Sequence, residues 1–317
     1  MNIFISGVAG FIGFSLADYF LKKNFTLYGI DNFDEYYSLK IKKKRLSILK
    51  KNKNFKFKNI DITNYKKIKK FIENKKIDVV IHLAAQAGVR YSLINPNKYL
   101  DTNITGFINL LKSIKNKKIK KFLYASSSSV YGDSNKFPLK ENTDLKPKNI
   151  YGSTKRINEL LADQYSKIYK IPFIGLRFFT IYGEWGRPDM FIFKLIKAHK
   201  KKKFFYLNNF GKHKRDFTYI GDVVKIINII TKKKIKNHNI FNICSNNPIN
   251  ILSIIKKFKK TNHLKLKLIK LNRADVLNTH GDNNKVNSFT KFENYSNFDE
   301  KFLKILKWYK SNKIDKL

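Results

Sequence analysis

The stretch Ile3-Phe4-Ile5-Ser6-Gly7-Val8-Ala9-Gly10-Phe11-Ile12-Gly13, near the start of the 317-residue chain, decides the fold. An apolar run typical of a buried strand leads into three glycines spaced G-x-x-G-x-x-G, and a helical pattern follows. In this context Gly7 permits a tight turn, Gly10 lets the backbone approach a pyrophosphate, and Gly13 lets the helix pack closely on the sheet. The helix N-terminus then presents free N–H groups to phosphates. The stretch predicts a dinucleotide site, although such a turn can also be purely structural.

Short apolar strands alternate with helical patterns through the first half of the chain, which indicates βαβ units. We therefore expect an α/β fold: a Rossmann-type doubly wound parallel sheet with a smaller C-terminal substrate-binding α/β domain. Strands are expected over residues 2–6, 26–31, 54–58, 78–83, 121–126 and 173–178. Helices are expected over residues 11–23, 38–51, 64–74, 97–117 and 150–169, and later near 190–199, 221–232, 250–260 and 299–311.

The regular alternation of predicted strands and helices ends near residue 180. The turn cluster 183–188 marks a boundary loop, and shorter, less regular elements follow it. We expect residues 1–180 to form the dinucleotide-binding domain and residues 181–317 to form the second domain. Residues 216–245 are expected to return to the first.

The formal net charge of +43 first suggests a nucleic-acid or membrane-surface protein. Arginine occurs only at positions 45, 90, 156, 177, 187, 215 and 273, which leaves 59 lysines among the 66 basic residues. The lysines are scattered over the whole chain, so compositional drift explains the charge better than a selected patch. We expect no nucleic acid and no membrane as partner. We take the positions where arginine persists as pointers to sites, because lysine cannot replace a planar two-pronged donor.

The remaining composition favours a cytoplasmic protein. No basic segment followed by a long apolar stretch opens the chain, so we expect no signal peptide. No run approaches the roughly 18 apolar residues of a membrane span. The single cysteine, Cys244, permits neither an intrachain disulfide nor a zinc cluster, and no metal is expected.

Acidic residues at two strand ends extend the dinucleotide site. Asp31, followed by Asn32, lies 18 residues after Gly13, close to the spacing of a carboxylate that binds the adenosine ribose hydroxyls. A carboxylate there repels a 2′-phosphate and so favours NAD over NADP. Asp61 closes the third strand, where it could accept from the adenine amino group. A solvated turn is the alternative for Asp31.

A tyrosine and a lysine are candidates for acid–base chemistry. Tyr151 and Lys155 are spaced i and i+4, on one face of a helix. A nearby ammonium would lower the pKa of the phenol from its usual value of about 10. Four serines, 126–129, end a central strand, and doubly wound folds bind ligands at the carboxyl ends of their strands.

These segments together resemble the extended short-chain dehydrogenase/reductase family and, within it, the UDP-glucuronate 4-epimerases. The resemblance extends from residue 3 to about residue 280. It is carried by residues 7–13, Ala84-Ala85-Gln86-Ala87-Gly88-Val89-Arg90-Tyr91-Ser92, residues 124–132, 151–156 and 176–180, Gly186-Arg187-Pro188-Asp189-Met190, and Arg215-Asp216-Phe217-Thr218-Tyr219.

The resemblance implies that C4 of UDP-glucuronate is inverted through transient oxidation with bound NAD. Tyr151 is then the acid/base, Lys155 holds the nicotinamide ribose, and Ser127 bridges the sugar and the tyrosine. With Tyr151 and Lys155, NAD would be held by Gly7, Gly10, Phe11, Ile12, Gly13, Asp31, Asn32, Asp61, Ile62, Leu83, Ala84 and Ala85. The UDP-sugar, bound mainly by the second domain, would be held by Arg90, Ser126, Ser127, Ser128, Thr180, Arg187, Arg215 and Asp275.

The carboxylate of the substrate must be protected while C4 is oxidised. Oxidation at C4 of a glucuronate gives a β-keto acid, which loses carbon dioxide readily when its carboxylate stands perpendicular to the carbonyl plane. An epimerase must therefore hold that carboxylate in a protective orientation. Hydroxyls of serines 126–128 and the guanidinium groups of Arg90 or Arg187 are suitable donors.

Several positions depart from the family pattern, and alternatives stay open. Phe14 replaces a small residue, Glu184 a proline, Gly221 an aspartate, and Arg273-Ala274 a Pro-Gly pair. The last change puts the expected contacts of that loop in doubt. A UDP-glucose or UDP-N-acetylhexosaminuronate 4-epimerase, and a UDP-glucuronate decarboxylase, remain possible, while a dehydratase lacks its acid pair after the serines. A non-catalytic NAD sensor would not need Tyr151, Lys155 and Ser127.

The helices expected over 97–117 and 150–169 carry more apolar positions than one core face needs. Members of the family pair these helices in a homodimer. We therefore expect a homodimer.

Overall fold

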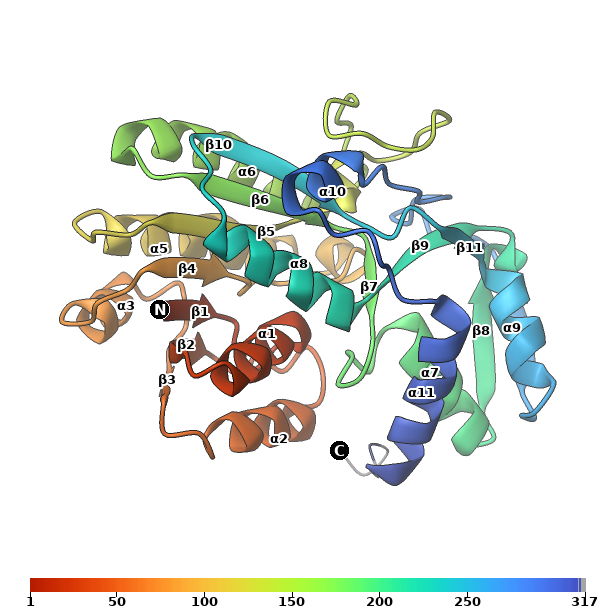
Figure 1. The fold of residues 1–317 in the computed structure, drawn as a ribbon. Coiled ribbons are helices and arrows are strands. Elements are labelled where there is room, and N and C mark those ends of the chain that lie inside the picture. The colour runs from red at the N-terminus through yellow and green to blue at the C-terminus, as the bar shows by residue number, and fades with distance from the viewer. Residues whose placement is uncertain (313, 315–317) are drawn as a thin grey trace.

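The computed structural model describes residues 1–312 and 314. Its centre is a seven-stranded parallel sheet in the order β10-β6-β5-β4-β1-β2-β3 (Figure 1). The strands are β1 (Asn2–Ser6), β2 (Thr26–Asp31), β3 (Phe55–Asn59), β4 (Val79–His82), β5 (Lys121–Ser127), β6 (Phe173–Phe178) and β10 (His238–Ile243). The expected Rossmann-type sheet is confirmed, and the six expected strands lie within one residue of their predicted ends.

Helices cover both faces of the sheet because alternate strand residues point to opposite sides. One apolar core holds Leu123 and Leu176 under α1 (Phe11–Lys22), α2 (Leu39–Leu49) and α8 (Ile220–Lys232). The other holds Phe122 and Tyr124 under α3 (Tyr65–Ile72), α5 (Gly106–Ile114) and α6 (Ile150–Tyr169). Figure 1 shows α1, α2 and α8 on the near face and α5 and α6 behind it.

The helical stretch expected over 97–117 is present over residues 96–114, but it is not one regular α-helix. The segment is α4 (Pro96–Tyr99), a π-helical turn (Leu100–Thr105) and α5. The wider turn brings the amide of Asn103 to Gln86, where it accepts from the backbone N–H (2.8 Å) and donates to the carbonyl (3.1 Å). The Asn103 amide also donates to Thr154 on α6 (3.0 Å). The hydrogen bonds of Asn103 to Gln86 and Thr154 thus accompany a π turn within a segment whose apolar pattern is that of a regular helix.

The second half of the chain forms two small sheets and their helices. The sheets are β11-β9-β7 and β12-β8, from β7 (Thr180–Tyr182), β8 (Phe204–Asn208), β9 (Lys214–Tyr219), β11 (Pro248–Asn250) and β12 (Lys265–Ile269). A separate apolar core packs them against α7 (Phe191–Lys200), α9 (Ile251–Lys259) and α11 (Phe298–Ser311).

Two later segments lie with the first half. β10 pairs with β6, and the short helix α10 (Asn284–Thr290), which the sequence pattern did not indicate, packs beside β10 and α8 (Figure 1). The division into domains at residue 180 stays a prediction.

The sheet order reverses between β1 and β4. In doubly wound folds ligands bind at this switch point, in the crevice outside the carboxyl ends of the strands. Ser6, Asp31, His82 and Ser127 end their strands here. The fold therefore brings the glycine-rich segment and the serine segment to one edge of the sheet.

The ring of Phe122 belongs to the apolar core between the sheet and helices α3, α5 and α6. It is fully buried and stacks on Phe173 with ring centroids 4.7 Å apart. Phe122→Ala should lower the free energy of unfolding by about 3–5 kcal/mol, because a large cavity would remain. Urea unfolding measures the loss, and Leu303→Ala, at a side chain 59% exposed on α11, should change it by less than about 0.5 kcal/mol. Equal effects of the two changes would contradict this account of the core.

Candidate active site

The glycine-rich turn between β1 and α1 leaves no room for side chains. Gly7 adopts φ +76°, and a Cβ there would lie 2.6 Å from the backbone nitrogen of Ala84. A Cβ at Gly13 would lie 2.1 Å from the Gly7 carbonyl oxygen. The helix therefore begins directly against the strand end, and its first N–H groups face the crevice.

A cavity follows this turn along the sheet edge. It is lined by nearly all residues predicted to hold the dinucleotide: Gly7, Gly10, Phe11, Ile12, Gly13, Asp31, Asn32, Ile62, Leu83, Ala84, Ala85, Tyr151 and Lys155. Asp61 is not among the lining residues. Its carboxylate instead accepts from Asn32 Nδ2 (2.7 Å) and from the N–H and hydroxyl of Thr63.

Asp31, at the end of β2, is held in a fixed position in the wall of this cavity. Its Oδ2 accepts from the Ala9 N–H (3.0 Å) and its Oδ1 from the Phe33 N–H (2.9 Å). Burial raises the pKa of this carboxyl group, and the charges of Lys42 and Arg45 oppose that shift. The carboxylate is thus held in place for a ligand hydroxyl.

Tyr151 and Lys155 point into the same cavity from the first turns of α6. The Asn149 side chain caps this helix by accepting from the Gly152 N–H (2.9 Å). Lys155 Nζ donates to the Ala125 carbonyl (2.9 Å) and lies 5.9 Å from the centre of the Tyr151 ring. Burial raises the pKa of Tyr151, while its hydrogen bond with Ser127 and the charge of Arg187 lower that pKa.

The four serines at the end of β5 contact different groups. The hydroxyl of Ser126 donates to Glu159 Oε1 (2.6 Å). Ser127 accepts from the Ser129 N–H (3.1 Å) and bonds with Tyr151, while Ser128 and Ser129 line a second cavity. Ser126 lines only the dinucleotide cavity, so the structure does not bring it to the second one.

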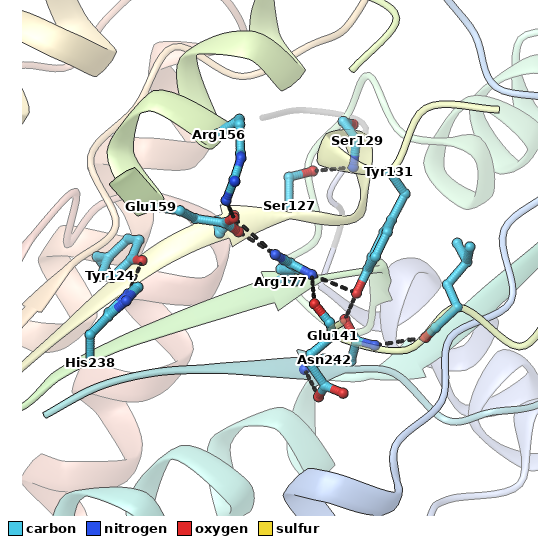
Figure 2. Close-up of polar contacts among 12 residues, drawn as sticks. Tyr124, Ser127, Ser129, Tyr131, Glu141, Arg156, Glu159, Arg177, His238 and Asn242 are labelled. Carbon is cyan, nitrogen blue, oxygen red and sulfur yellow. Dashed lines mark hydrogen bonds and ion pairs between the residues drawn. The ribbon is translucent and has the colours of Figure 1, made fainter. Parts of the chain in front are cut away.

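A buried ion pair fixes the serine segment from behind (Figure 2). Arg177 on β6 binds both carboxylate oxygens of Glu159 on α6, at 2.8 and 2.9 Å. Its remaining nitrogen donates to the Tyr131 hydroxyl and the Glu141 carbonyl, and Tyr131 in turn donates to Asn242 on β10. Because Tyr151, Lys155 and Glu159 follow one another at i, i+4 and i+8, this pair also fixes the face of α6 that carries the tyrosine.

The second cavity opens beside the first and measures about 840 Å³, a typical size for a small-molecule site. Ser127, Tyr151 and Arg187 line both cavities. The other predicted substrate residues that line it are Arg90, Ser128, Thr180, Arg215 and Asp275. The tyrosine therefore stands on the wall that the two cavities share.

Arg187 lies in the boundary loop and is paired within it. Its Nε and Nη2 donate to the two oxygens of Asp189, and Asp189 also accepts from the Tyr36 hydroxyl (3.3 Å). The guanidinium lies 5.5 Å from the ring centre of Tyr36 and 6.0 Å from that of Tyr37. Burial acts to lower the pKa of Arg187, but Asp189 outweighs burial and raises it, so the group stays charged.

Arg90, Asp275 and Arg215 are held by contacts within the wall of the second cavity. Arg90 donates to both oxygens of Asp275, through Nε at 3.3 Å and Nη2 at 2.6 Å. Arg215 donates to the carbonyls of Lys214, Val276 and Leu277, and burial lowers its pKa to about 10. Of the two positions that depart from the family pattern here, Ala274 lines the second cavity beside Asp275, and Arg273 is not among its lining residues.

Sequence reasoning missed several lining residues. Ser129 belongs to the same serine run and could have been included from it. Tyr36, Tyr37 and Lys42 reach the dinucleotide cavity from the segment after β2. Lys194 on α7 lines the second cavity, and no motif marks it. Within the described residues no group of three or more His, Cys, Asp or Glu side chains could hold a metal ion.

A doubly wound sheet with a glycine-rich turn, and a Tyr–Lys pair between a dinucleotide cavity and a second cavity, defines an extended short-chain dehydrogenase/reductase. The model of the NAD dependent epimerase/dehydratase family matches residues 3–244, and the chain belongs to that family.

Relatives with assigned activities span the whole chain. The UDP-glucuronate 4-epimerase of Thermodesulfobacterium geofontis is 40% identical, over 97% of this chain and 96% of that protein. The probable UDP-glucuronate 4-epimerase of Rhizobium meliloti is 32% identical, over 98% of both. The crystal structure of UDP-glucuronic acid 4-epimerase from Bacillus cereus, in complex with UDP-glucuronic acid and NAD, matches with a TM-score of 0.92 at 30% identity. That match covers 98% of this chain and 99% of the other.

The burial of Lys155 has a measurable consequence for stability. Burial lowers its pKa from 10.5 to about 8. Between these values the unfolded chain holds a proton that the folded, cofactor-free chain has released. The free energy of unfolding should therefore rise by about 3 kcal/mol as the pH increases through this window, and this group adds no slope below it.

The comparison of Lys155→Met with the unchanged protein isolates this term, because the other lysines titrate in both. Urea unfolding from pH 7 to 10.5 should show a flatter profile for Lys155→Met. Lys167→Met, at a lysine 66% exposed on α6, should keep the original slope. Parallel profiles for Lys155→Met and the unchanged protein would show that Lys155 is not desolvated.

Proposed function

We propose that the protein is an NAD-dependent 4-epimerase that interconverts UDP-glucuronate and UDP-galacturonate. The observation that carries this proposal is the place of Tyr151, bonded to Ser127, on the wall between the two cavities. The full-length similarity to UDP-glucuronate 4-epimerases supports the choice of substrate.

The residues of the first cavity fit a dinucleotide. Because neither Gly7 nor Gly13 carries a Cβ, α1 begins directly against the strand end, and its N-terminal N–H groups are available to a pyrophosphate. Asp31 presents a fixed carboxylate at the far end, which suits ribose hydroxyls and repels a 2′-phosphate. In this proposal NAD is held by the thirteen predicted residues that line the cavity, and Asp61 acts only by orienting Asn32.

NAD, when bound, supplies a reversible hydride acceptor for C4 of the sugar. Tyr151 takes the proton from the O4 hydroxyl and returns it after the 4-keto sugar has presented its other face. Ser127 holds both the phenol oxygen and the sugar oxygen. Burial raises the pKa of Tyr151, and its hydrogen bond with Ser127 and the charge of Arg187 act against that shift. The ammonium of Lys155, on the same helix face, would favour the phenolate in the same way.

The carboxylate of the sugar requires its own donors. Arg187 keeps its charge and lies on the shared wall, and Ser128, Ser129 and Thr180 line the second cavity beside it. We assign the carboxylate to these four residues. We assign the diphosphate to Arg90, Arg215 and Lys194, which line the same cavity. Arg90 would then exchange its contact with Asp275 for a phosphate.

Apolar side chains remain exposed on the outer face of α6, on the π-helical turn and in the segment just before α4. They are Leu93, Ile94, Leu100, Ile157, Leu160 and Ile168, exposed by 36–77%. Residues 157, 160 and 168 share one face of α6. A second copy of the chain would bury this surface, so we propose a homodimer formed through it.

We place the enzyme in the cytoplasm, which suits the single, buried and unpaired Cys244. In the described part of the chain, no helix has the length and apolar character needed to cross a membrane. The absence of a nucleic-acid partner stays a prediction.

The decisive experiment is to incubate the purified protein with UDP-glucuronate, without added reductant, and to follow it by proton NMR. UDP-galacturonate should appear at unchanged mass. Tyr151→Phe should bind NAD but turn over about 10²–10⁴-fold more slowly, because it cannot accept the O4 proton. A UDP-pentose product, or epimerisation of UDP-glucose alone, would overturn the proposed substrate and leave the fold and the tyrosine chemistry standing.

The dimer surface has a separate test. Leu160→Lys should yield monomers in light scattering after gel filtration, because a charge at the centre of the apolar face opposes its burial. Leu303→Lys, at an equally exposed leucine on α11, should leave the dimer intact. A monomeric unchanged protein would refute the assignment.

A further inference from the structure

Arg45 on α2 is fully buried, although it lies in none of the segments assigned to cofactor or substrate. It is one of only seven arginines in a chain with 59 lysines. Burial lowers its pKa and so disfavours its charge, and its Nε has no hydrogen-bond partner. A buried cation of this kind contributes little to stability by itself. We therefore look for its role in the groups that accept hydrogen bonds from its planar guanidinium.

The fork of Arg45 joins two loops that are far apart in the sequence. Nη1 donates to the Ala9 carbonyl, inside the glycine-rich turn, at 2.9 Å. Nη1 also donates to the Tyr37 hydroxyl at 2.9 Å. Nη2 donates to the carbonyls of Trp185 and Gly186, which directly precede Arg187. One planar group therefore ties the dinucleotide turn to the loop that carries Arg187.

The backbone that Arg45 holds is in an unusual conformation. Trp185 adopts φ +61°, a region that costs an aromatic residue of order 1–3 kcal/mol and persists only where the surroundings impose it. Its ring packs edge-on against Phe14 (5.5 Å) and Trp308 (5.2 Å). The ring contacts fix the side chain, and Arg45 fixes the carbonyl.

Tyr37 connects Arg45 to Arg187 directly. The Arg45 guanidinium lies 5.6 Å from the Tyr37 ring centre and the Arg187 guanidinium lies 6.0 Å from it. The Tyr37 ring also lines the dinucleotide cavity. The position of Arg187 thus depends on Arg45 through both the backbone and this ring.

We propose that Arg45 is a positioning residue that fixes Arg187 relative to the dinucleotide turn and thereby prevents loss of the substrate carboxylate as carbon dioxide. This inference rests on the proposed function. In the competing reaction the C5–C6 bond of the 4-keto uronate breaks, carbon dioxide leaves, and the bonding electron pair forms an enolate with the C4 carbonyl. A proton added at C5 then gives a UDP-4-keto-pentose. Suppressing this reaction requires the carboxylate, and hence Arg187, to be held in one orientation.

The test compares Arg45→Lys and Arg45→Met with the unchanged protein. Lysine keeps the charge but has one nitrogen, which cannot serve both loops. Products from UDP-glucuronate are separated by mass, and the fraction that has lost carbon dioxide should rise about tenfold in both variants, as it should in Arg187→Met. The NAD retained after gel filtration should fall in both Arg45 variants, since the Ala9 carbonyl is released, and should fall less in Arg187→Met, which keeps the contact with Ala9.

Lys121→Met is the matched control. Lys121 is also a buried cation that donates only to backbone carbonyls, those of Ile230, Thr231 and Lys233 at the end of α8. Its removal should lower stability without changing the product fraction. Tyr37→Phe, which removes one acceptor of Arg45 and keeps the ring, provides a milder variant if Arg45→Met does not fold.

The outcomes separate this inference from the proposed function. If the unchanged protein makes no UDP-galacturonate, the proposed function fails. If it does, and folded Arg45→Lys loses no more carbon dioxide than Lys121→Met, the positioning role of Arg45 is refuted. A raised fraction in Arg45→Met with a normal one in Arg45→Lys would also refute it, because charge alone would then suffice.

Discussion

The close approach of α1 to the carboxyl end of β1 is the constraint on which the rest of the molecule depends. The Gly7 carbonyl occupies the space that a Cβ of Gly13 would need, so the helix starts directly on the sheet. This contact places the free N–H groups of α1 in the crevice where the strand order reverses. Asp31, the serine segment and the boundary loop are arranged around that point. A bulkier residue at either glycine would move the helix away from all of them.

Charged side chains inside this fold serve to fix backbone segments. Arg177 with Glu159 holds the end of β5, Arg45 holds the boundary loop, and Lys155 contacts the Ala125 carbonyl. Each buried cation incurs a desolvation cost. Arg177 and Arg45 are compensated by several acceptors in fixed geometry, whereas Lys155 has the Ala125 carbonyl. The tyrosine therefore lies in a rigid, polar frame, while the two apolar cores on either side of the sheet supply the stability.

Much of the fold and of the site could be predicted from the sequence. Buried parallel strands and the helix of Tyr151 have strong local patterns, and α6 spans the predicted residues 150–169. The break at Asn103 could not be foreseen, because the apolar pattern continues through it and only the tertiary contact with Gln86 reveals it. Arg45 was visible only as an unusual residue type, since its partners are 36 and 140 residues away. The direction of the Ser126 hydroxyl likewise depends on a partner 33 residues along the chain.

The π-helical turn at Leu100–Thr105 has a consequence for how the chain tolerates change in length. A π turn takes one residue more than an α turn to complete about the same rotation, so the ends of this helix are oriented as in a regular helix one residue shorter. Loss of a single residue within the turn would therefore restore a regular helix and leave the apolar residues of α5 in the core. What depends on the additional residue is the widened backbone that brings Asn103 to Gln86. The segment thus allows a change of one residue in length without moving its flanking helices, at the expense of that polar contact.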